Sequence, residues 1–417
     1  MQIDIAGHDN IHQPAVADRI GLAKLASMAF NGVSLEPLQQ DLTDKLTRGT
    51  ADAGVGLDLS LIAQLLGQKE IGLQIQNQVL AVHRLFRSPC AVAPPRLRVL
   101  ALAAEIDMGG NTPIEFLLEG SDIELTTLYV VPGQDVPLPL PQHDVAIVIA
   151  SDSPQSRAAL AEIARLAPRW PRPILNPPLR ISNLDRDKLY RLLRGIEGID
   201  IPATIAVCRE QLDDVAESRT SMVTVGQGAA FPVIVRPRDS HAGRGLARVT
   251  DPAALRAYLD GHPGREFFIS RFVDYASADG LFRKYRIAVL DGKTYPCHMA
   301  IADRWDIWYL NAGMAFSESK RAEEAAFMRT FPEGFAARHQ TALSQMIERV
   351  GLDYFLVDCA ENQNGELLIF EADNTAIVHN MDSPQLFPYK SPEMLKIFEA
   401  FAAMLADRAH HNAVRAA

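Results

Sequence analysis

Three carboxylates near the end of the chain are spaced as if to share a metal ion. The segments YFLVDCAENQ and ELLIFEADN meet at Asn364-Gly365, a strong signal for a two-residue β-hairpin loop. In that register Asp358 lies directly opposite Glu371, and Asp373 shares the face of Glu371 because side chains alternate along a strand. Like charges so close repel one another unless a cation such as Mg²⁺, which prefers oxygen ligands, lies between them. The pattern predicts a magnesium site, with solvated carboxylates at a sheet edge as the alternative.

A glycine-containing loop upstream has the composition of a phosphate-binding segment. In FPVIVRPRDSHAGRGLARV (231–249) a strand ends at Arg236, a loop carries Ser240, Gly243 and Gly245, and a second strand follows. Glycine lets backbone N–H groups approach phosphate oxygens, and the arginine supplies positive charge. The signatures GxGxxG after a first strand, GxxxxGK[ST], HExxH and GxSxG are absent. The sequence therefore argues against a dinucleotide-binding Rossmann site and a P-loop.

Composition restricts the class of protein. The chain has 417 residues, 48% of them hydrophobic, which is typical of globular proteins, and a formal net charge of -10. An acidic balance disfavours nucleic acid as a partner. No apolar run reaches the ~20 residues that cross a bilayer, and MQIDIAGHDN has no signal-peptide features. Four widely spaced cysteines without a CxxC pair fit a reducing compartment. We expect a cytoplasmic protein with no nucleic-acid or membrane partner.

The elements that must position these residues fall into three regions. Residues 1–92 read as a helical N-terminal region, a cap or a homodimer contact. The prolines in AVAPPR (91–96) begin a second region, 96–181, in which strands alternate with helices, as in a parallel sheet. The helices expected in these two regions are 15–30, 57–66, 71–86, 113–118 and 156–166. The expected strands are 96–104, 123–131, 146–150 and 173–175.

The third region, 182–417, mixes hairpins with helices. Asp291-Gly292 separates YRIAVL from KTYPCHMAI and predicts a second tight hairpin. Residues 391–405 read as a closing amphipathic helix. The fold class expected for the chain is therefore α/β together with α+β, the third region containing a large antiparallel sheet.

Five segments in order resemble the ATP-grasp superfamily, in particular its RimK-like and D-alanine–D-alanine ligase-like carboxylate–amine ligases. They are LDRDKLYRLLRGIEGIDIPAT (184–204), FPVIVRPRDSHAGRG (231–245), FFISRFVDY (267–275), KYRIAVLDGK (284–293) and GLDYFLVDCAENQNGELLIFEADN (351–374). The resemblance covers about 96–405 and leaves 1–92 outside. It implies an ATP-grasp fold in which 96–181 is the pre-ATP-grasp α/β domain and 182–417 the ATP-grasp domain. Within the latter it implies a nucleotide lid subdomain at about 200–275 and a metal-binding subdomain at about 276–417.

The resemblance also implies how a nucleotide is held. Lys188 matches a lysine that holds the phosphates, and Arg236 stands in place of a second one. The loop that contains Ser240, Gly243 and Gly245 matches a flap over the phosphates. The hinge strand that accepts adenine matches 268–273, which contains Ser270, Arg271, Phe272 and Val273. Asp279 matches a residue that serves the ribose.

The metal-binding and catalytic positions follow from the same resemblance. Asp358 and Glu371 match the two magnesium ligands, and Asp373 occupies the place of a third ligand that is typically Asn. Arg286 matches an arginine that reaches the reacting phosphate, and Lys284 replaces its usual acidic neighbour. Three further positions are assigned less directly from their place in the motifs. Arg304 and Asn311 would frame the substrate carboxylate, and His379 would act as a general base or simply lie in the substrate loop.

The chemistry implied by the resemblance uses ATP and Mg²⁺. Such enzymes activate a carboxylate as an acyl phosphate, which an amine of an amino acid or peptide then attacks. Positioning and charge stabilisation supply most of the catalysis. Two alternatives stay open at this stage: a phosphotransferase on the same scaffold, or a degenerate ATP-grasp module that binds a nucleotide or peptide without turnover.

Overall fold

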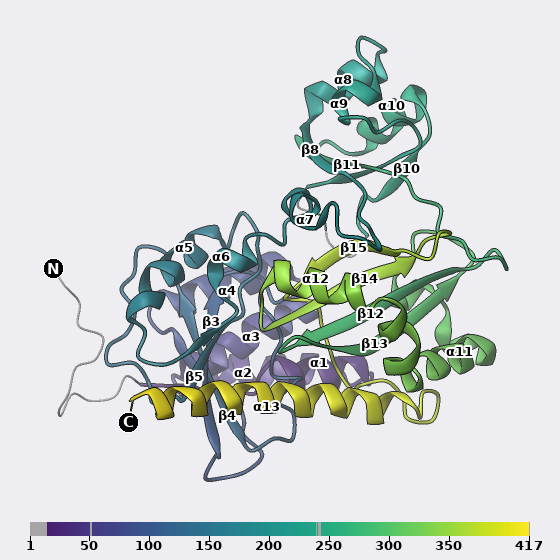
Figure 1. Ribbon diagram of the computed structural model, residues 1–417. Coiled ribbons are helices and arrows are strands. Elements are labelled where there is room, and N and C mark those ends of the chain that lie inside the picture. Colours follow the sequence, from purple (N-terminus) through teal and green to yellow (C-terminus); the bar gives the residue numbers. More distant parts are fainter. Residues whose placement is uncertain (1–14, 51, 239, 241–242, 417) are drawn as a thin grey trace. The chain divides into compact units, whose positions relative to one another are not determined.

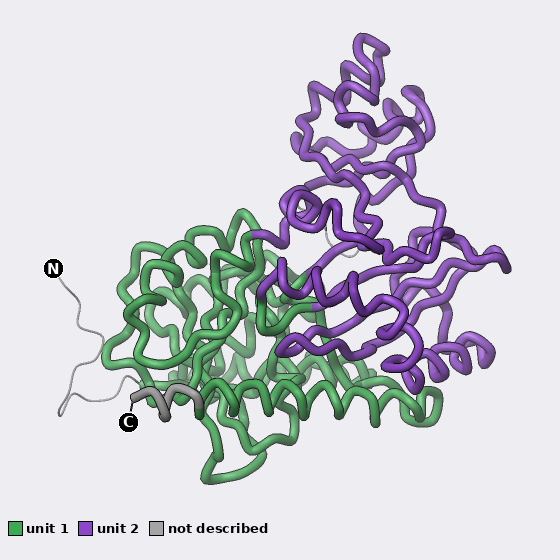
Figure 2. Tube along the Cα trace, viewed as in Figure 1, with its two compact units in different colours: residues 1–182, 352–355, 373–417 green, residues 183–351, 356–372 purple. Residues whose placement is uncertain are grey.

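The computed structural model describes residues 15–416 apart from residues 51, 239, 241 and 242. The chain forms two compact units, which Figure 2 shows in different colours. Unit 1 consists of residues 1–182, 352–355 and 373–417, and unit 2 of residues 183–351 and 356–372. The start of the chain, MQIDIAGHDN, and part of the glycine-containing loop, residues 239 and 241–242, lie outside the described residues.

Unit 1 contains a six-stranded sheet with the order β1-β2-β4-β3-β5-β6 (Figure 1). Strands β3, β4, β5 and β6 are parallel, whereas β2 is antiparallel to β4. Both β3 and β4 are buried along nearly their whole length, as in parallel sheets that are covered on both faces. The predicted parallel layer is confirmed. The strands are β1 (Ala17–Asp18), β2 (Leu85–Arg87), β3 (Leu97–Ala104), β4 (Ile123–Val130), β5 (Val145–Val148) and β6 (Ile174–Leu175).

The helices of unit 1 come from both ends of the chain. Their bounds are α1 (Leu22–Phe30), α2 (Glu36–Thr47), α3 (Ala53–Leu65), α4 (Lys69–Leu80), α5 (Arg157–Leu166), η1 (Ala167–Arg169), α6 (Pro178–Ile181) and α13 (Lys390–Ala416). Helix α3 is buried on almost every side, and it packs against α4. Gly72 of α4 makes this approach possible, because a Cβ there would lie 2.6 Å from Cγ of Gln64.

The N-terminal region differs from the all-helical expectation. The helix predicted over 15–30 begins only at Leu22, and the one predicted over 71–86 ends at Leu80. The residues that are not helical pair as β1 and β2 and extend the sheet. Asp58 of α3 fixes the chain between β1 and α1, because its carboxylate accepts hydrogen bonds from the backbone N–H groups of Ile20 (2.7 Å) and Gly21 (3.1 Å).

A second difference concerns the segment 113–118, for which the sequence predicts a helix. The structure has turns there, after an antiparallel bridge between Asn111 and Ala150. The backbone N–H of Thr112 also donates to the carbonyl of Ile149 at 2.7 Å. These contacts with the end of β5 hold the segment against the sheet edge, so that tertiary hydrogen bonds override its local helical preference.

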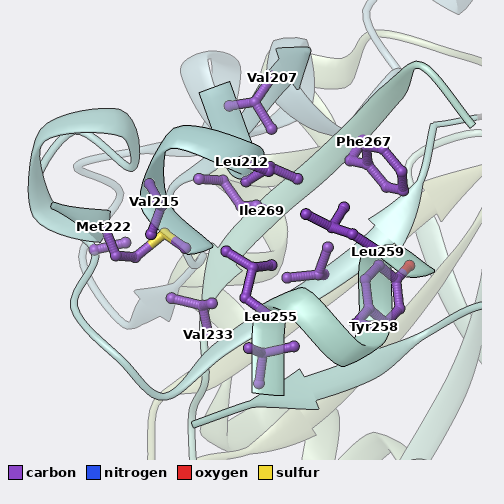
Figure 3. Packing of buried hydrophobic residues seen from close by; sticks show 13 residues of the cluster. Val207, Leu212, Val215, Met222, Val233, Leu255, Tyr258, Leu259, Phe267 and Ile269 are labelled. Atoms are coloured by element: carbon purple, nitrogen blue, oxygen red, sulfur yellow. The ribbon is translucent and has the colours of Figure 1, made fainter. Parts of the chain in front are cut away.

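The first sheet of unit 2 is antiparallel, with the order β10-β9-β11-β8. One face packs on three helices, and Figure 3 shows the resulting core, in which Leu212, Leu255 and Ile269 meet. The elements are β8 (Thr204–Cys208), α8 (Arg209–Ala216), α9 (Met222–Val225), β9 (Val233–Pro237), β10 (Ala247–Val249), α10 (Pro252–Gly261) and β11 (Glu266–Arg271). The predicted strand–loop–strand at 231–249 is confirmed by the pairing of β9 with β10.

The second sheet of unit 2 has the order β13-β12-β14-β15-β7. Its strands are β7 (Ile199–Asp200), β12 (Phe282–Leu290), β13 (Lys293–Ala302), β14 (Tyr354–Glu361) and β15 (Leu367–Asp373). The helical segments around it are α7 (Arg186–Leu193), η2 (Tyr309–Asn311), η3 (Met314–Phe316), α11 (Glu318–Arg329), η4 (Pro332–Ala336) and α12 (Gln340–Val350). Parallel and antiparallel sheets thus coexist with helices, and the predicted fold class is confirmed.

The two predicted hairpins have different outcomes. Leu290 pairs with Lys293, and the positive φ angles of Asp291 (46°) and Gly292 (78°) give the two-residue turn that the sequence predicts. The loop at Asn364-Gly365 is one residue longer than predicted. The N–H of Asn362 donates to the carbonyl of Glu366 (3.0 Å), and the N–H of Gly365 donates to the carbonyl of Asn362 (2.9 Å). Asn362 is therefore opposite Glu366, and the register at this loop is shifted by one from the predicted one.

Candidate functional site

A cluster of charged side chains lies in unit 2. We call it the charged cluster and define it as Arg186 of α7, Arg236 of β9, Lys284 and Arg286 of β12, Asp358 of β14 and Glu371 of β15. Lys284 and Arg286 are two residues apart on one strand and thus share a face. Strand β12 is the neighbour of β14, and β14 of β15, which brings both cations and both carboxylates onto adjacent strands (Figure 1).

Asp358 is held by two cations. Nε and Nη2 of Arg286 lie 2.8 and 3.0 Å from its two carboxylate oxygens, and Nζ of Lys284 lies 2.8 Å from Oδ2. The Asp358 side chain is only 5% exposed. Burial alone would raise its pKa, but Arg286 and Lys284 outweigh burial and hold the pKa of Asp358 well below its usual range. The carboxylate is therefore ionised at neutral pH.

Glu371 forms the second ion pair of the charged cluster, with Arg186 as its partner. Burial would raise the pKa of Glu371 and the nearby charge of Asp358 adds to this, but Arg186, Lys284 and Arg236 together lower it. The two carboxylates therefore influence one another even though the hairpin register differs from the predicted one. Arg186 was not among the residues singled out from the sequence. The only pointer to it is its place two residues before Lys188, which lies on the same helix α7.

Arg236 links the charged cluster to the glycine-containing loop. Its Nε donates to Oγ of Ser240 at 3.1 Å, and its Nη2 donates to the Ser240 carbonyl. Burial and the positive charge of Arg186 lower the pKa of Arg236 to about 10, so that it stays protonated at neutral pH. Gly243 and Gly245 have φ angles of 71° and 67°. A Cβ at Gly245 would lie 2.7 Å from Cδ of Pro237, so the loop needs glycine there for its shape.

The predicted adenine hinge uses much of its own hydrogen-bonding capacity within the fold. Ser270 pairs with β8 and β9, and the pairing of β11 with β9 ends at Arg271. The side chain of Arg271 forms an ion pair with Asp200. The N–H of Phe272 donates to the carbonyl of Pro232 at 3.2 Å.

The hinge side chains that follow the end of β11 offer an apolar wall. The ring of Phe272 is T-shaped to Trp305, with 5.7 Å between the ring centroids. The guanidinium of Arg248 lies over the Phe272 ring, 4.1 Å from the ring centroid. Val273 packs against a buried cluster that includes Tyr275 and Leu368. Such a surface is suited to the flat face of a base.

The carboxylate of Asp279 lies in an exposed turn and forms local hydrogen bonds. Both oxygens accept hydrogen bonds from Arg283, at 3.1 and 2.8 Å, and Oδ1 also accepts from the N–H of Leu281 at 3.0 Å. The hydrogen bond from Arg283 lowers the pKa of Asp279 to about 2. These contacts stabilise the turn before β12.

Arg304 and Asn311 stabilise the loop that contains them. Nε of Arg304 donates to Asp306 at 2.6 Å on an exposed surface. The side chain of Asn311 donates to the carbonyl of Asp306 (3.0 Å) and accepts from the N–H of Trp308 (3.0 Å). Through these hydrogen bonds Asn311 stabilises the turn that contains it.

His379 belongs to unit 1. Its ring lies near those of Phe30 and Phe116, with centroid distances of 5.9 and 6.3 Å. Its Nδ1 accepts a hydrogen bond from the N–H of Met381 at 3.1 Å. The lone pair of Nδ1 is thus already engaged, which leaves Nε2 as the protonated nitrogen of the neutral ring.

The predicted metal ligands have different surroundings. Asp358 and Glu371 are ionised oxygen donors on neighbouring strands, a donor set that fits Mg²⁺ when phosphate and water supply the remaining ligands. Asp373 accepts hydrogen bonds from the N–H and hydroxyl of Thr375, at 2.7 and 2.8 Å. Within the described part of the chain, no three His, Cys, Asp or Glu side chains form a group that could hold a metal ion. The predicted cluster of three carboxylates is therefore not formed, because cations pair with two of them and a local turn engages the third.

Comparison with known proteins finds similarity only at the level of structure. No protein-family model matches the chain, and no curated protein matches it. The solved structures that it resembles include a RimK-domain ATP-grasp protein from Sphaerobacter thermophilus, with 16% identity and a TM-score of 0.44 over 74% of this chain and 99% of that one. A D-alanine–D-alanine ligase from Bacillus anthracis in complex with ATP has 13% identity and a TM-score of 0.46, over 76% and 99%. A D-Ala:D-Ser ligase from Enterococcus faecalis has 13% identity and a TM-score of 0.41, over 73% and 99%.

These three solved structures share 13–16% sequence identity with the chain. Because the TM-scores lie below 0.5, we base the proposals below on the chain's own residues. Among the helices in the described ranges, none combines the length and hydropathy needed to cross a bilayer.

Proposed function

We propose that the protein is an ATP- and Mg²⁺-dependent ligase, which activates a carboxylate as an acyl phosphate and joins it to an amine of an amino acid or peptide. The charged cluster carries this proposal. Four cationic side chains, Arg186, Arg236, Lys284 and Arg286, surround two ionised carboxylates and leave a surplus of positive charge. Such a surplus in a partly buried site suits a polyphosphate.

Each member of the cluster has a task in this proposal. Arg286 is anchored on Asp358 by two hydrogen bonds, so that its planar guanidinium has a fixed orientation towards a phosphoryl group. Arg236 fixes the start of the glycine-containing loop through Ser240 and places its charge beside the phosphates, together with Lys188 of α7. These side chains act by positioning and by stabilising charge, which is most of what phosphoryl transfer requires of a protein.

Asp358 and Glu371 are the residues that would hold magnesium. When bound there, the ion would neutralise negative charge that develops on the transferred phosphoryl group. Both carboxylates are ionised at neutral pH, as metal ligands must be. Phe272, Val273 and Trp305 would line the base, and Asp279 and the substrate residues Arg304 and Asn311 are placed by the motifs alone.

The test is ADP release from ATP and Mg²⁺ in the presence of amino acids and peptides, singly and in pairs. A ligase releases ADP and phosphate only when both a carboxylate and an amine are present. ADP release with one acceptor and a phosphorylated product would favour the phosphotransferase. Nucleotide binding without ADP in any mixture would favour the binding module.

A matched pair of variants tests the site. Glu371→Gln removes a proposed magnesium ligand and should lower turnover about 100-fold or more. Glu366→Gln changes the same side chain at the loop end of β15, where it accepts a hydrogen bond from Asn362, and should leave turnover close to that of the unmodified protein. Full turnover in Glu371→Gln would contradict the assignment of the site.

A further inference from the structure

We propose that Lys284 exchanges its ion-pair partner during ligand binding. In the nucleotide-free protein Lys284 pairs with Asp358, and it moves to a phosphate oxygen when magnesium binds Asp358. This inference rests on the proposed function, because it concerns the same carboxylate. It makes Lys284 a positioning residue that couples the binding of the metal to that of the nucleotide.

The first argument is the crowding at one carboxylate oxygen. Oδ2 of Asp358 accepts from Nζ of Lys284 at 2.8 Å and from Nη2 of Arg286 at 3.0 Å. Magnesium binds carboxylate oxygens at about 2.1 Å and requires near-octahedral geometry. A divalent ion on that oxygen would lie against an ammonium and a guanidinium, so at least one of these cations has to leave.

Lys284 is the cation that can leave. Arg286 contacts both oxygens of Asp358 through a planar group, whereas Lys284 contacts one oxygen through a flexible stem. If Lys284 moves away, Asp358 keeps the two hydrogen bonds of Arg286. If Arg286 moved instead, a larger and more rigid group would have to be displaced from a buried position. The exchange of Lys284 therefore costs fewer interactions.

The surroundings also keep Lys284 close after it leaves Asp358. Its Nζ lies 5.7 Å from the centroid of the Phe370 ring, within the range of a cation–π contact. Its charge also acts on Glu371, the other proposed ligand. An ammonium released from Asp358 therefore remains beside the carboxylates, where the phosphates of a magnesium-bound nucleotide would lie.

The consequence is a coupling between two ligands. In the absence of nucleotide, magnesium has to displace Lys284 without offering it another partner, so binding of the metal alone is weak. With nucleotide present, a phosphate oxygen receives Lys284, and the displacement is compensated. Couplings of this kind typically change an affinity about 5- to 150-fold, and they act equally in both directions.

The experiment compares Lys284→Met with Lys293→Met, a control at the other end of the β12–β13 hairpin, where Lys293 opens β13. Isothermal titration with MgCl₂ alone should show that Lys284→Met binds the ion at least about 10-fold more tightly than the unmodified protein. Titration with ADP should show that magnesium raises ADP affinity at least about 5-fold in the unmodified protein and far less in Lys284→Met. Lys293→Met should match the unmodified protein in both titrations.

The outcomes separate this inference from the proposed function. Equal or weaker magnesium binding by Lys284→Met overturns the exchange, even if the unmodified protein binds magnesium and ADP as a ligase should. Absence of ADP binding to the unmodified protein counts against the ligase, whereas the titration with MgCl₂ alone still decides the exchange. Lys284→Gln, which keeps a polar group near Asp358, provides the same comparison should the methionine variant fail to fold.

Discussion

The ion pair between Arg286 and Asp358 allows a quantitative prediction of stability. Arg286→Met removes a guanidinium that contacts both oxygens of the Asp358 carboxylate, which is 5% exposed. Removing one partner of a buried pair usually costs about 3–5 kcal/mol. Lys284 stays 2.8 Å from Oδ2 and compensates part of that loss. We therefore expect the free energy of unfolding of unit 2 to fall by about 2–3 kcal/mol.

Tryptophan fluorescence can report on unit 2 alone. Trp305 and Trp308 lie in unit 2 and Trp170 in unit 1, so Trp170→Phe provides a suitable background. Urea unfolding of this background, Arg286→Met, Asp358→Asn and the double variant gives the coupling energy of the pair. We expect about 2 kcal/mol, within the range for residues in direct contact.

A second arginine on the same strand is the control. Arg283 also forms bidentate contacts, but its partners Asp279 and Glu323 are 48% and 43% exposed. Exposed pairs contribute little, so Arg283→Met should cost about 1 kcal/mol or less. A coupling energy between Arg286 and Asp358 below about 0.5 kcal/mol, the limit of additivity for independent sites, would refute the assignment of a tight buried pair.

Three further predictions concern other parts of the chain. Burial raises the pKa of Asp58 from 3.8 to about 6, so the stability that protonated Asp58 contributes is complete below about pH 4 and is lost as the pH rises through 6. In urea unfolding followed through Trp170, the stability advantage of the unmodified protein over Asp58→Asn should therefore fall by up to about 3 kcal/mol between pH 4 and 7. A difference that stays constant over this range would contradict the prediction. Gly245→Ala should destabilise the sheet β10-β9-β11-β8 by more than the roughly 1–2 kcal/mol of backbone strain that it shares with Gly243→Ala. The reason is that, among the described atoms, an added Cβ meets Pro237 at position 245 and meets nothing within 4 Å at position 243. Amide exchange of β9 and β10 measures the difference, and equal effects of the two substitutions would count against the clash. His379→Ala should keep its turnover, since Nδ1 already accepts from Met381, whereas a loss of about 100-fold would restore the general-base role.

The two hairpins show what a local signal predicts and what it misses. Asp291-Gly292 forms the predicted turn because its two positive φ angles satisfy the geometry of a two-residue loop. At Asn364-Gly365 the side chain of Asn362 accepts hydrogen bonds from the N–H groups of Asn364 and Glu366, and it donates to Asp200 of β7 at 3.1 Å. A contact with a residue 162 positions away helps to select the longer loop, and a pairing rule based on the turn alone could not include it.

The sequence predicts the two carboxylates of the charged cluster but not Arg186, whose place in the cluster also depends on a long-range contact. Asp358 and Glu371 stand out in the sequence because carboxylates are unusual inside apolar strands. Arg186 does not, because an arginine in the first turn of a helix usually faces solvent. Only the fold brings it to Glu371, 185 positions along the chain, and so identifies it as part of the site.

The residue types alone also do not determine which cation of the charged cluster pairs with which carboxylate. With more cations than carboxylates nearby, several arrangements satisfy the same composition, and the sequence favoured one in which the carboxylates face a metal. The structure has each carboxylate neutralised by protein cations: Asp358 by Lys284 and Arg286, and Glu371 by Arg186. On the exchange proposed above, a metal ion that binds Oδ2 of Asp358 releases Lys284, and a phosphate can receive it. A substitution in the cluster then changes two equilibria at once, the ion pair and the binding of the ligand that replaces it, so turnover alone cannot separate the two.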